Sequence, residues 1–380
     1  MLALSCHNAM PTNRLLARFS RYHSAKPTYQ KDHRAMRKGS TGSTLTEVAK
    51  AAGVSMITAS RAIRGLGYVS EATRQRVLQA AEQLHYQPDM LAKRMRGDTG
   101  NLIGVFINNF GSVVMHELIS AISQEARRLG YDLVVFHAQS FNEPGRAATS
   151  DMLRKLCEGL LLVLPNTFDH YLDRLEKDRF PCVLVNFAAR KMDLPVVVCQ
   201  NRQGARDAID HLLALGHRRI GFIAGTPFTG QSAERQRGYV DALCAAGVDI
   251  DPALIVEGDF TQVSGFPAAE HLLSLADPPT AIFAANDEMA LGALDAIRTR
   301  GLSVPDDISL VGFDDIPAAR YAYPALTTLS QPFAEMGVRA VKELVEIMKG
   351  KEVTAQRIEF ATPMALRGST GPVRTTQSGT

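Results

Sequence analysis

The sequence predicts an α/β protein in three parts: an N-terminal head of three helices in a helix-turn-helix, a hinge helix, and a body of two doubly wound subdomains with parallel sheets. Three observations support this fold class. Short amphipathic helices around a glycine turn occupy residues 44–84. Apolar strand-like runs alternate with amphipathic helical stretches from residue 102 onward. The 380 residues exceed what one ordinary domain needs, and 46% of them are hydrophobic, enough for a sizeable core.

Charge is distributed unevenly along the chain. Residues 1–97 contain 16 Lys and Arg against 5 Asp and Glu, whereas the remainder contains 26 against 34. A basic N-terminal part beside a mildly acidic body is typical of proteins that bind nucleic acid. A soluble enzyme with a basic tail is the alternative interpretation of the charge alone.

Residues 1–42 are rich in Arg and nearly free of acidic residues, and we expect them to form a disordered basic extension. They superficially resemble an organellar transit peptide, and they contain no apolar segment of a secretory signal. Our preferred hypothesis is that translation starts at Met36, which leaves the short lead-in MRKGSTGS before the first helix. An intact Met1 in the mass spectrum of the native protein would refute it.

The composition also argues against several kinds of site. The five cysteines are widely spaced and form no C-x-x-C pair, so neither a zinc site nor a disulfide framework is indicated. We expect no metal and no cofactor. No apolar run approaches the roughly 18 residues that span a bilayer. Buried thiols in a reducing cytosol are the simplest account of the cysteines, so we expect a cytoplasmic protein.

The DNA-binding head is expected over residues 43–87. Thr44 can cap a first helix, and Glu47 completes a capping box three residues later. Gly53 then allows the left-handed conformation that a sharp turn requires. A first helix followed by a tight turn is the opening of a helix-turn-helix.

A second helix is expected from near Ser55 to about Ile63, and a third, capped by Ser70, over roughly 71–84. Val54, Ala59 and Ile63 should face the core of the head. The opposite face should contact phosphates and base edges in a DNA major groove, because hydroxyls suit phosphate oxygens, an arginine suits guanine, and apolar side chains suit thymine methyls. These predicted DNA-binding residues are Ser55, Met56, Ile57, Thr58, Ser60 and Arg61.

Residues 88–100 predict the hinge helix and linker. Pro88 ends the third helix, and a helix this short is marginal in water, so we expect it to order on DNA. Lys93 adds basic charge, small Ala92 allows close approach, and apolar Met95 suits a wedge between base pairs in a minor groove. A solvated basic linker is the alternative.

The body is expected over residues 101–367, with a first join between subdomains near 190–200 and crossovers near 327–332. Its strand candidates are 102–108, 132–138, 159–165, 182–187, 196–200, 219–225, 254–260, 281–286 and 308–314. Helical stretches between them include 115–129, 201–215, 232–246, 262–275 and 288–300. Apolar strands alternating with helices predict parallel sheets buried on both faces.

Ligands of such folds bind beyond the carboxyl ends of the strands. Polar and aromatic residues at or near these ends are the candidates, together with an arginine early on a helix: Asn109, Asn186, Phe260, Asn286, Asp287, Asp314, Asp315 and Arg235. Such groups suit a polyhydroxy ligand. We expect Asp287 and Asp315 to act mainly as helix caps. His217 is expected to make a structural polar contact. We find no catalytic motif, so no catalytic residue is predicted.

Head, hinge and body together resemble the lactose/galactose-repressor (LacI/GalR) family of bacterial transcription regulators over about 44–367. The resemblance rests on ordered motifs: TEVAKAAGVSMITASRAI, YVSEATRQRVLQAAEQLHYQP, LIGVFI, HLLALGHRRIGFIAG, SAERQRGYVDAL, AANDEMALGAL, VPDDISLVGFDD and PALTTLSQP. It implies a body like periplasmic binding proteins and a homodimer whose heads occupy the half-sites of a near-palindromic operator in double-stranded DNA. Met95 would replace the usual wedging leucine.

The resemblance also implies roles in the body. Arg235, Asn286 and Asp314 match effector contacts of the family, and Gln231 and Phe260 match further lining positions. The chain departs from the family where its first strand ends Asn-Asn instead of Pro-Asp, and where Asn186 and Gln200 replace frequent aspartates. A small sugar or sugar acid is the effector implied.

The tail at 368–380 has no leucine heptads, which argues against a tetramerising extension, and we expect it to be disordered. Together these features predict a non-enzymatic, sequence-specific regulator of carbohydrate genes, repression being the default of the family. Effector binding would change the angle between the subdomains and thereby order or melt the hinges. One alternative is an exported solute-binding protein, which is disfavoured because no signal peptide is found. The other is an enzyme, which is disfavoured because no catalytic motif is found.

Overall fold

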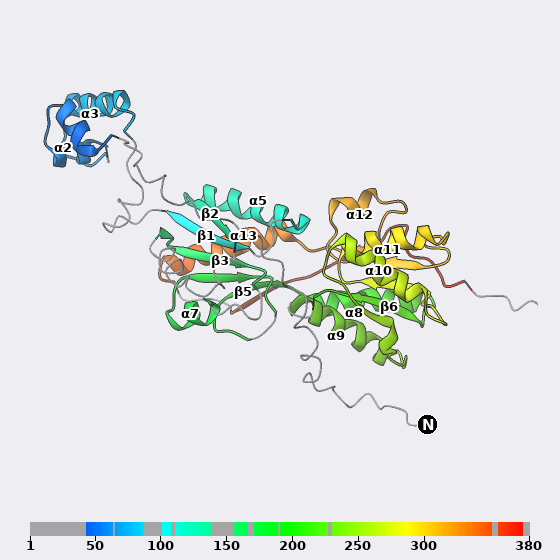
Figure 1. Ribbon diagram of the computed structural model, residues 1–380. Helices are drawn as coiled ribbons and strands as arrows, with labels where there is room; N and C mark the ends of the chain where they lie inside the picture. Colours follow the sequence, from blue (N-terminus) through cyan, green and yellow to red (C-terminus); the bar gives the residue numbers. More distant parts are fainter. Residues whose placement is uncertain are drawn as a thin grey trace, which may run out of the picture. The chain divides into compact units, whose positions relative to one another are not determined.

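The computed structural model describes residues 43–63, 65–86, 101–107, 111–137, 156–165, 171–188, 191–226, 230–351 and 356–374. The chain divides into two compact units, residues 1–98 and 99–380, which contain the head and the body (Figure 1). The predicted extension at 1–42 and the hinge at 88–100, with Ala92, Lys93 and Met95, lie outside the described residues.

The head consists of α1 (Leu45–Ala51), α2 (Met56–Ile63) and α3 (Glu71–Gln83). The predicted capping box is present: the Thr44 backbone amide donates to Glu47 Oε2 at 2.6 Å, and the Glu47 amide donates to Thr44 Oγ1 at 3.3 Å. Gly53 has φ +65° in the turn between α1 and α2, a conformation that favours glycine. The local signals in the sequence therefore correctly predicted the start of α1 and the turn that follows it.

A small apolar core joins the three helices of the head. Val48, Ala59 and Val77, one from each helix, are fully buried. Val54 and Ile63 pack at the edge of this core and are half-buried. Because α2 turns this face inward, the residues on its other face remain available to a partner.

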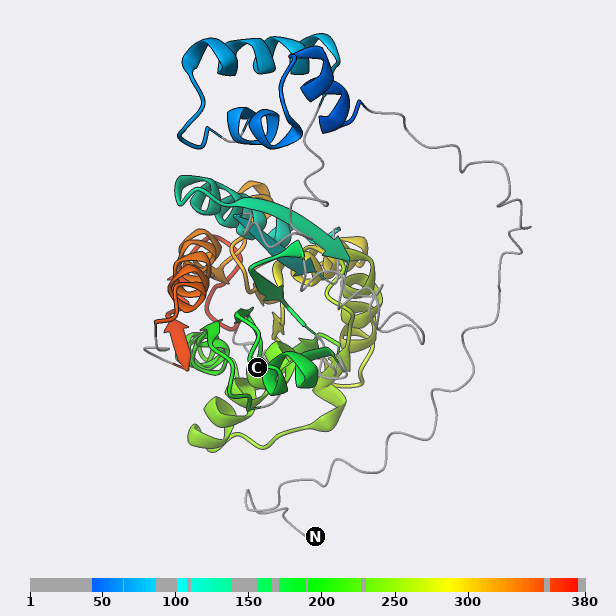
Figure 2. The same cartoon turned by 90° about the vertical axis from the view of Figure 1, so that its left-hand side faces the viewer.

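The body contains two parallel sheets, one in each subdomain (Figures 1 and 2). The first has the strand order β11-β5-β4-β3-β1-β2, made of β1 (Leu102–Ile107), β2 (Asp132–His137), β3 (Gly159–Val163), β4 (Cys182–Val185), β5 (Val196–Cys199) and β11 (Arg357–Phe360). The second has the order β7-β6-β8-β9, made of β6 (Ile220–Ala224), β7 (Ile255–Glu257), β8 (Ala281–Ala284) and β9 (Ser309–Val311). All nine expected strands are present.

Helices cover both sheets, as buried parallel strands require. In the first subdomain α5 (Val113–Arg128) and α13 (Phe333–Met348) pack side by side, and α7 (Tyr171–Lys177) also belongs to it. In the second, α8 (Asn201–Ala214) packs on α9 (Gly230–Ala245), and α10 (Gln262–Leu273) packs on α11 (Asp287–Thr299). The short α12 (Pro317–Tyr321) follows β9.

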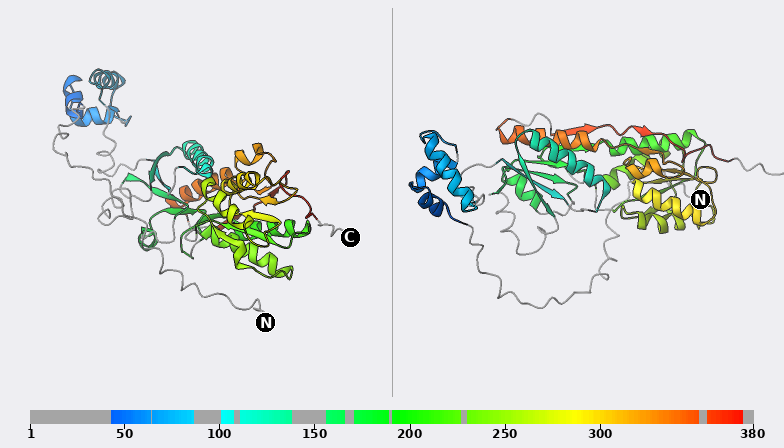
Figure 3. Two further views of the ribbon diagram at one scale, coloured as in Figure 1. Left: turned by 45° about the vertical axis from the view of Figure 1, so that its right-hand side comes forward. Right: turned by 90° about the horizontal axis from the view of Figure 1, so that it is seen from above.

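The chain passes between the subdomains three times. It leaves the first after β5 at residue 199, returns between β10 (Thr328–Leu329) and α13, and crosses again between β11 and β12 (Met364–Ala365) (Figure 3). The first two passages lie where we expected them. The third was missed because β10 and β12, which pair antiparallel, have only two residues each.

The expectation of a disordered tail over 368–380 is wrong for residues 368–374. Ser369 is buried, and its hydroxyl donates to the Leu310 carbonyl at 2.6 Å. The Val373 amide donates to the Leu215 carbonyl at 3.0 Å. These residues add backbone and side-chain hydrogen bonds to the second subdomain. Hydrophobic periodicity does not detect such a segment, because it is anchored mainly by polar contacts.

His217 makes the structural polar contact that we expected, and its partners explain why the tail is ordered. One ring nitrogen lies 2.9 Å from Thr280 Oγ1, and the other lies 3.0 Å from both Ser309 Oγ and the Gly371 carbonyl. Burial lowers the pKa of His217. The tail thus gives His217 and Ser309 an additional hydrogen-bond partner each.

Among the described residues, no helix combines the length and the apolar character that crossing a membrane would need.

Ending the chain at Arg367 should lower the free energy of unfolding of the body by about 2–4 kcal/mol, because it removes hydrogen bonds and leaves His217 and Ser309 short of partners. Urea denaturation measures the change. A chain ending at Arg374 is the matched control, and equal unfolding midpoints for the two would contradict the anchoring role of the tail.

Candidate functional site

A cavity of about 240 Å³ lies between the subdomains, beyond the carboxyl ends of strands from both sheets. It is lined by Ser112, Val114, Met115, Leu164, Asn186, Thr226, Gln231, Arg235, Asp259, Phe260, Asn286, Asp314, Gln331 and Phe333. Six of the seven predicted effector residues are among these. The seventh, Asn109, lies outside the described residues.

Arg235 on α9 is buried and engaged at each of its three nitrogens. Nε donates to Asn201 Oδ1 at 2.9 Å, and one terminal nitrogen donates to the Ala285 carbonyl. The other terminal nitrogen lies 3.6 Å from the Asp314 carboxylate. The guanidinium also lies over the Phe313 ring, 3.8 Å from its centroid. Arg235 is therefore held in one orientation at the wall of the cavity.

Asp314 follows β9 and shares this buried site. Its Oδ1 accepts a hydrogen bond of 2.5 Å from Gln331 Nε2. Burial raises the pKa of Asp314 to about 7, although the Arg235 guanidinium acts in the opposite direction, and the nearby Asp287 carboxylate adds to the rise. Burial therefore favours the neutral form of this carboxyl group, and the Arg235 guanidinium favours its charged form.

The expectation that Asp287 caps a helix is wrong, because Asn286 occupies that position. The Met289 amide donates to Asn286 Oδ1 at 3.0 Å, while Asn286 Nδ2 donates to the Phe260 carbonyl at 2.9 Å. Asp287 is fully buried and accepts hydrogen bonds from the Ile316 amide at 2.9 Å and from Thr328 Oγ1 at 2.5 Å. It therefore connects the loop after β9 to β10, and burial raises its pKa to about 6.

Asp315 is not a helix cap either. The residue before α12 is Ile316, whose side chain makes no capping hydrogen bond. Asp315 instead pairs with Arg367 at 2.5 Å and with Arg320 at 3.0 Å. A local sequence motif could not reveal this pairing, because Arg367 is 52 positions away.

Asn186 follows β4 and belongs to the first subdomain. Its Nδ2 donates to Gln331 Oε1 at 3.3 Å, and its backbone carbonyl accepts a hydrogen bond from Gln231 Nε2. Its Oδ1 is buried and has no hydrogen-bond partner among the described residues. Because an unpaired buried oxygen costs about 1–3 kcal/mol, this atom favours a ligand that donates a hydrogen bond.

Phe260 supplies an aromatic wall. Its ring lies so close to Gly225 that a Cβ atom added there would stand 2.0 Å from the ring. Gly225, next to the carboxyl end of β6, is therefore required for the ring to reach its place. Val114 and Phe333 add apolar surface from the first subdomain.

Four polar residues of the cavity were not predicted from the sequence: Gln331, Asp259, Thr226 and Ser112. Asp259 and Thr226 lie two residues beyond β7 and β6, so the rule that ligands bind beyond strand ends could have found them. Gln331 lies in a crossover between subdomains, and only the tertiary structure brings it to the cavity.

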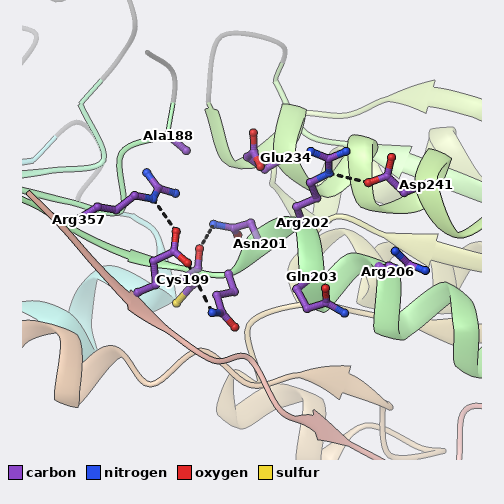
Figure 4. A pocket seen from close by; sticks show the side chains of 11 residues that line it. Ala188, Cys199, Asn201, Arg202, Gln203, Arg206, Glu234, Asp241 and Arg357 are labelled. Atoms are coloured by element: carbon purple, nitrogen blue, oxygen red, sulfur yellow. Dashed lines mark hydrogen bonds and ion pairs between the residues drawn. The ribbon is translucent and has the colours of Figure 1, made fainter. Parts of the chain in front are cut away.

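A second cavity of about 480 Å³ lies beside the passage from β5 to α8 (Figure 4). Four of its charged side chains form two ion pairs: Arg202 with Asp241 at 2.6 Å, and Arg357 with Glu359 at 2.6 Å. It contains none of the predicted site residues, and these charged groups are largely solvated. The interdomain cavity is the better ligand site, because its polar groups are buried and partly unpaired.

In the head, the predicted face of α2 is accessible. Ser55, Met56, Ile57 and Arg61 are exposed, and Thr58 and Ser60 are half-buried. Met56 and Ile57 are 55% and 63% exposed, which is high for apolar residues at a helix start. Ser55 Oγ accepts from the Thr58 amide at 3.1 Å and so caps α2, which is a structural role for this predicted contact.

The head and the body each match known proteins. Residues 44–89 match the model of the bacterial regulatory proteins of the lacI family, and residues 209–370 match that of the periplasmic binding protein-like domain. The HTH-type transcriptional repressor CytR of Escherichia coli K12 is 35% identical, and the match covers 88% of this chain and 98% of that protein. This chain belongs to the LacI family. Catabolite control protein A of Priestia megaterium is 32% identical, over 86% of this chain and 99% of that protein.

Solved structures of transcriptional regulators have a similar fold over most of the chain. A Lac repressor dimer bound to operator and the anti-inducer ONPF has a TM-score of 0.76 and 30% identity, covering 87% of this chain and 99% of that one. A complex of the regulator CelR with cellobiose has a TM-score of 0.66 and 30% identity, covering 86% and 99%. The family relationship makes this chain a DNA-binding transcriptional regulator, and the relatives named here are transcriptional regulators, not enzymes.

The raised pKa of Asp314 predicts a pH dependence. A carboxyl whose pKa is higher in the folded protein than in the unfolded chain contributes stability at low pH, and this contribution is lost as the pH rises from about 4 to about 7. Asp314→Asn should therefore show a flatter fall of stability over this range, by up to about 1.4 kcal/mol per pH unit. Thermal unfolding between pH 5 and pH 8 measures the slope. Asp249→Asn, at an exposed position, is the control, and a slope unchanged in Asp314→Asn would contradict the burial argument.

Proposed function

We propose that this protein is a repressor of carbohydrate genes, that it binds a near-palindromic operator as a homodimer, and that a small sugar or sugar acid in the interdomain cavity controls its affinity for DNA. The observation that carries the proposal is the combination of an accessible apolar and polar α2 face in the head with a buried, partly unpaired polar cavity in the body. We place it at the bacterial nucleoid in the cytoplasm.

The head supports sequence-specific binding. The exposed start of α2 offers Met56 and Ile57 for contact with thymine methyls, and Arg61 for a guanine edge. Thr58 and Ser60 offer hydroxyls to phosphates. A dimer would place two such helices in successive major grooves, about one helical turn apart. The Lac repressor that matches this chain is a dimer bound to operator.

The cavity supports a sugar-like effector. A sugar ring has an apolar face that can lie on an aromatic side chain such as Phe260, and hydroxyls that can donate to Asn186 Oδ1 and Asp314. Asn286 and Arg235 are held by hydrogen bonds on the same wall. The matching CelR structure contains cellobiose, a carbohydrate.

The position of the cavity supports allostery. Its walls belong to both subdomains, so a ligand that contacts Asn186 and Asp314 together stabilises one angle between them. That angle would set the spacing of the paired hinges at 88–100, and Met95 would enter the minor groove only when the spacing fits. A coupling of this kind is typically worth about 1–3 kcal/mol.

Gel-shift titration of the purified protein against the DNA upstream of its own gene, with and without a panel of sugars and sugar acids, tests the proposal. We expect a specific complex whose affinity changes by about fivefold or more with one compound. A protein with no preference for any palindrome over random duplex would refute the DNA-binding half. A specific complex that no carbohydrate alters would refute the effector half.

Ile57→Ala should weaken specific operator binding by roughly tenfold, because it removes an apolar contact with a base. Nonspecific binding should change little, since it depends on phosphate contacts. Fluorescence anisotropy with operator and random duplexes measures both. Leu78→Ala, which truncates an exposed apolar residue on α3, is the control. Equal losses on both duplexes would remove Ile57 from base recognition.

Arg235→Ala should abolish the effector response and leave operator binding intact, because Arg235 lies in the cavity and is distant in sequence from the head. The ratio of operator affinities with and without effector should fall to one. Arg237→Ala, two residues along the same helix and exposed, is the control, and circular dichroism checks folding. A normal response of the Arg235 variant would place the effector elsewhere.

A further inference from the structure

Five polar residues are connected across the interdomain cavity by hydrogen bonds and an ion pair, and the backbone of α9 completes the ring. Gln231 Nε2 donates to the Asn186 carbonyl, Asn186 Nδ2 donates to Gln331 Oε1 at 3.3 Å, and Gln331 Nε2 donates to Asp314 Oδ1 at 2.5 Å. Asp314 then pairs with Arg235 at 3.6 Å, four residues after Gln231 on α9. Gln231, Arg235 and Asp314 belong to the second subdomain, and Asn186 belongs to the first. The ring therefore connects the two subdomains.

Gln331 is the member of this ring that belongs to a crossover. It lies between β10 and α13, so the backbone that holds it joins the two subdomains. The backbone amide of Gln331 donates to the backbone carbonyl of Asp314 at 3.3 Å. The backbone carbonyl of Gln331 accepts a hydrogen bond of 2.9 Å from the backbone amide of Phe333, which is the first residue of α13. The side chain is 6% exposed. Two hydrogen bonds therefore connect the Asp314 carboxyl group to the start of α13: one from the Gln331 side chain to Asp314, and one from the Phe333 backbone amide to Gln331.

The ring is complete except at one atom. Gln331 uses the donor of the Asn186 amide, and the acceptor Oδ1 of the same amide has no partner among the described residues. An effector hydroxyl that donates to this oxygen would add to the ring without displacing any bond in it.

We propose that Gln331 is a positioning residue that holds the cleft closed in the effector-free protein and relays the state of Asp314 to the crossover before α13. The relay rests on the proposed function, because it assigns an effector to the cavity. The closure itself needs no effector. Gln331 bonds each subdomain through one end of its amide, so an isosteric side chain without donor or acceptor should uncouple them.

Hydrogen exchange measured by mass spectrometry on the effector-free protein tests the closure. In Gln331→Met, amides within 326–334 and 184–188 should exchange about tenfold faster than in the unchanged protein, while amides of β6 and β8 keep their rates. Gln203→Met removes a glutamine whose amide bonds Asp207 on the surface of α8, and it should change neither segment.

A second variant distinguishes positioning from simple packing. Gln331→Glu keeps an acceptor for Asn186 Nδ2 but loses the donor to Asp314 and places two carboxylates together. As the pH falls from 8 to 6 the two carboxyls share a proton, which restores the missing hydrogen bond. The excess exchange of Gln331→Glu, corrected for intrinsic rates, should therefore shrink toward acid, and that of Gln331→Met should not.

Three outcomes would overturn the proposal: unchanged exchange at 326–334 in Gln331→Met, equal acceleration throughout the body, or a pH-independent excess in Gln331→Glu. Each concerns the effector-free protein. A protein that shows the expected exchange but whose operator affinity no carbohydrate alters would instead reject the proposed effector and leave the closure standing.

Discussion

The buried ion pair between Arg235 and Asp314 is the interaction on which the site depends. Taking two charges out of water costs several kcal/mol per ion, and their attraction offsets this only when further hydrogen bonds satisfy them. Here Asn201, the Ala285 carbonyl and Gln331 provide those bonds. Apolar residues in these places could stabilise the fold equally well. The pair therefore contributes by fixing the orientation of the polar groups at the cavity, and it contributes little to the free energy of unfolding.

A second constraint is the threefold passage of the chain between the subdomains. Each subdomain has a sheet covered by helices and its own apolar core. The chain connects the two subdomains after β5, after β10 and after β11. These three connections restrict the relative motion of the subdomains chiefly to a change in the angle between them. A ligand that contacts both subdomains therefore bears mainly on this angle.

The expectations that the structure contradicts share one cause. Asp287 and Asp315 were expected to cap helices because each stands just before a helical pattern, yet Asn286 caps α11. Asp287 instead binds Ile316, 29 positions away, and Asp315 binds Arg367, 52 positions away. The tail after Arg367 was expected to be disordered, yet Ser369 lies in the second subdomain. In each case a polar contact with residues distant in sequence decides the outcome.

The sequence by itself determined the order of elements and the chemistry at their ends. Periodicity located every strand of the two main sheets except β11, and the strand-end rule, with the family resemblance, selected six residues that line one cavity. Those signals are local. A strand that is buried on both faces is a short run of apolar residues, and a sharp turn needs a residue such as glycine, so each can be recognised within about ten residues of sequence. Only the tertiary structure decided that Gln331 joins Asp314 to Asn186, since these three residues are separated by 17 and 145 positions. Hydrogen bonds between such distant residues follow from how the crossovers pack, and no local pattern specifies them.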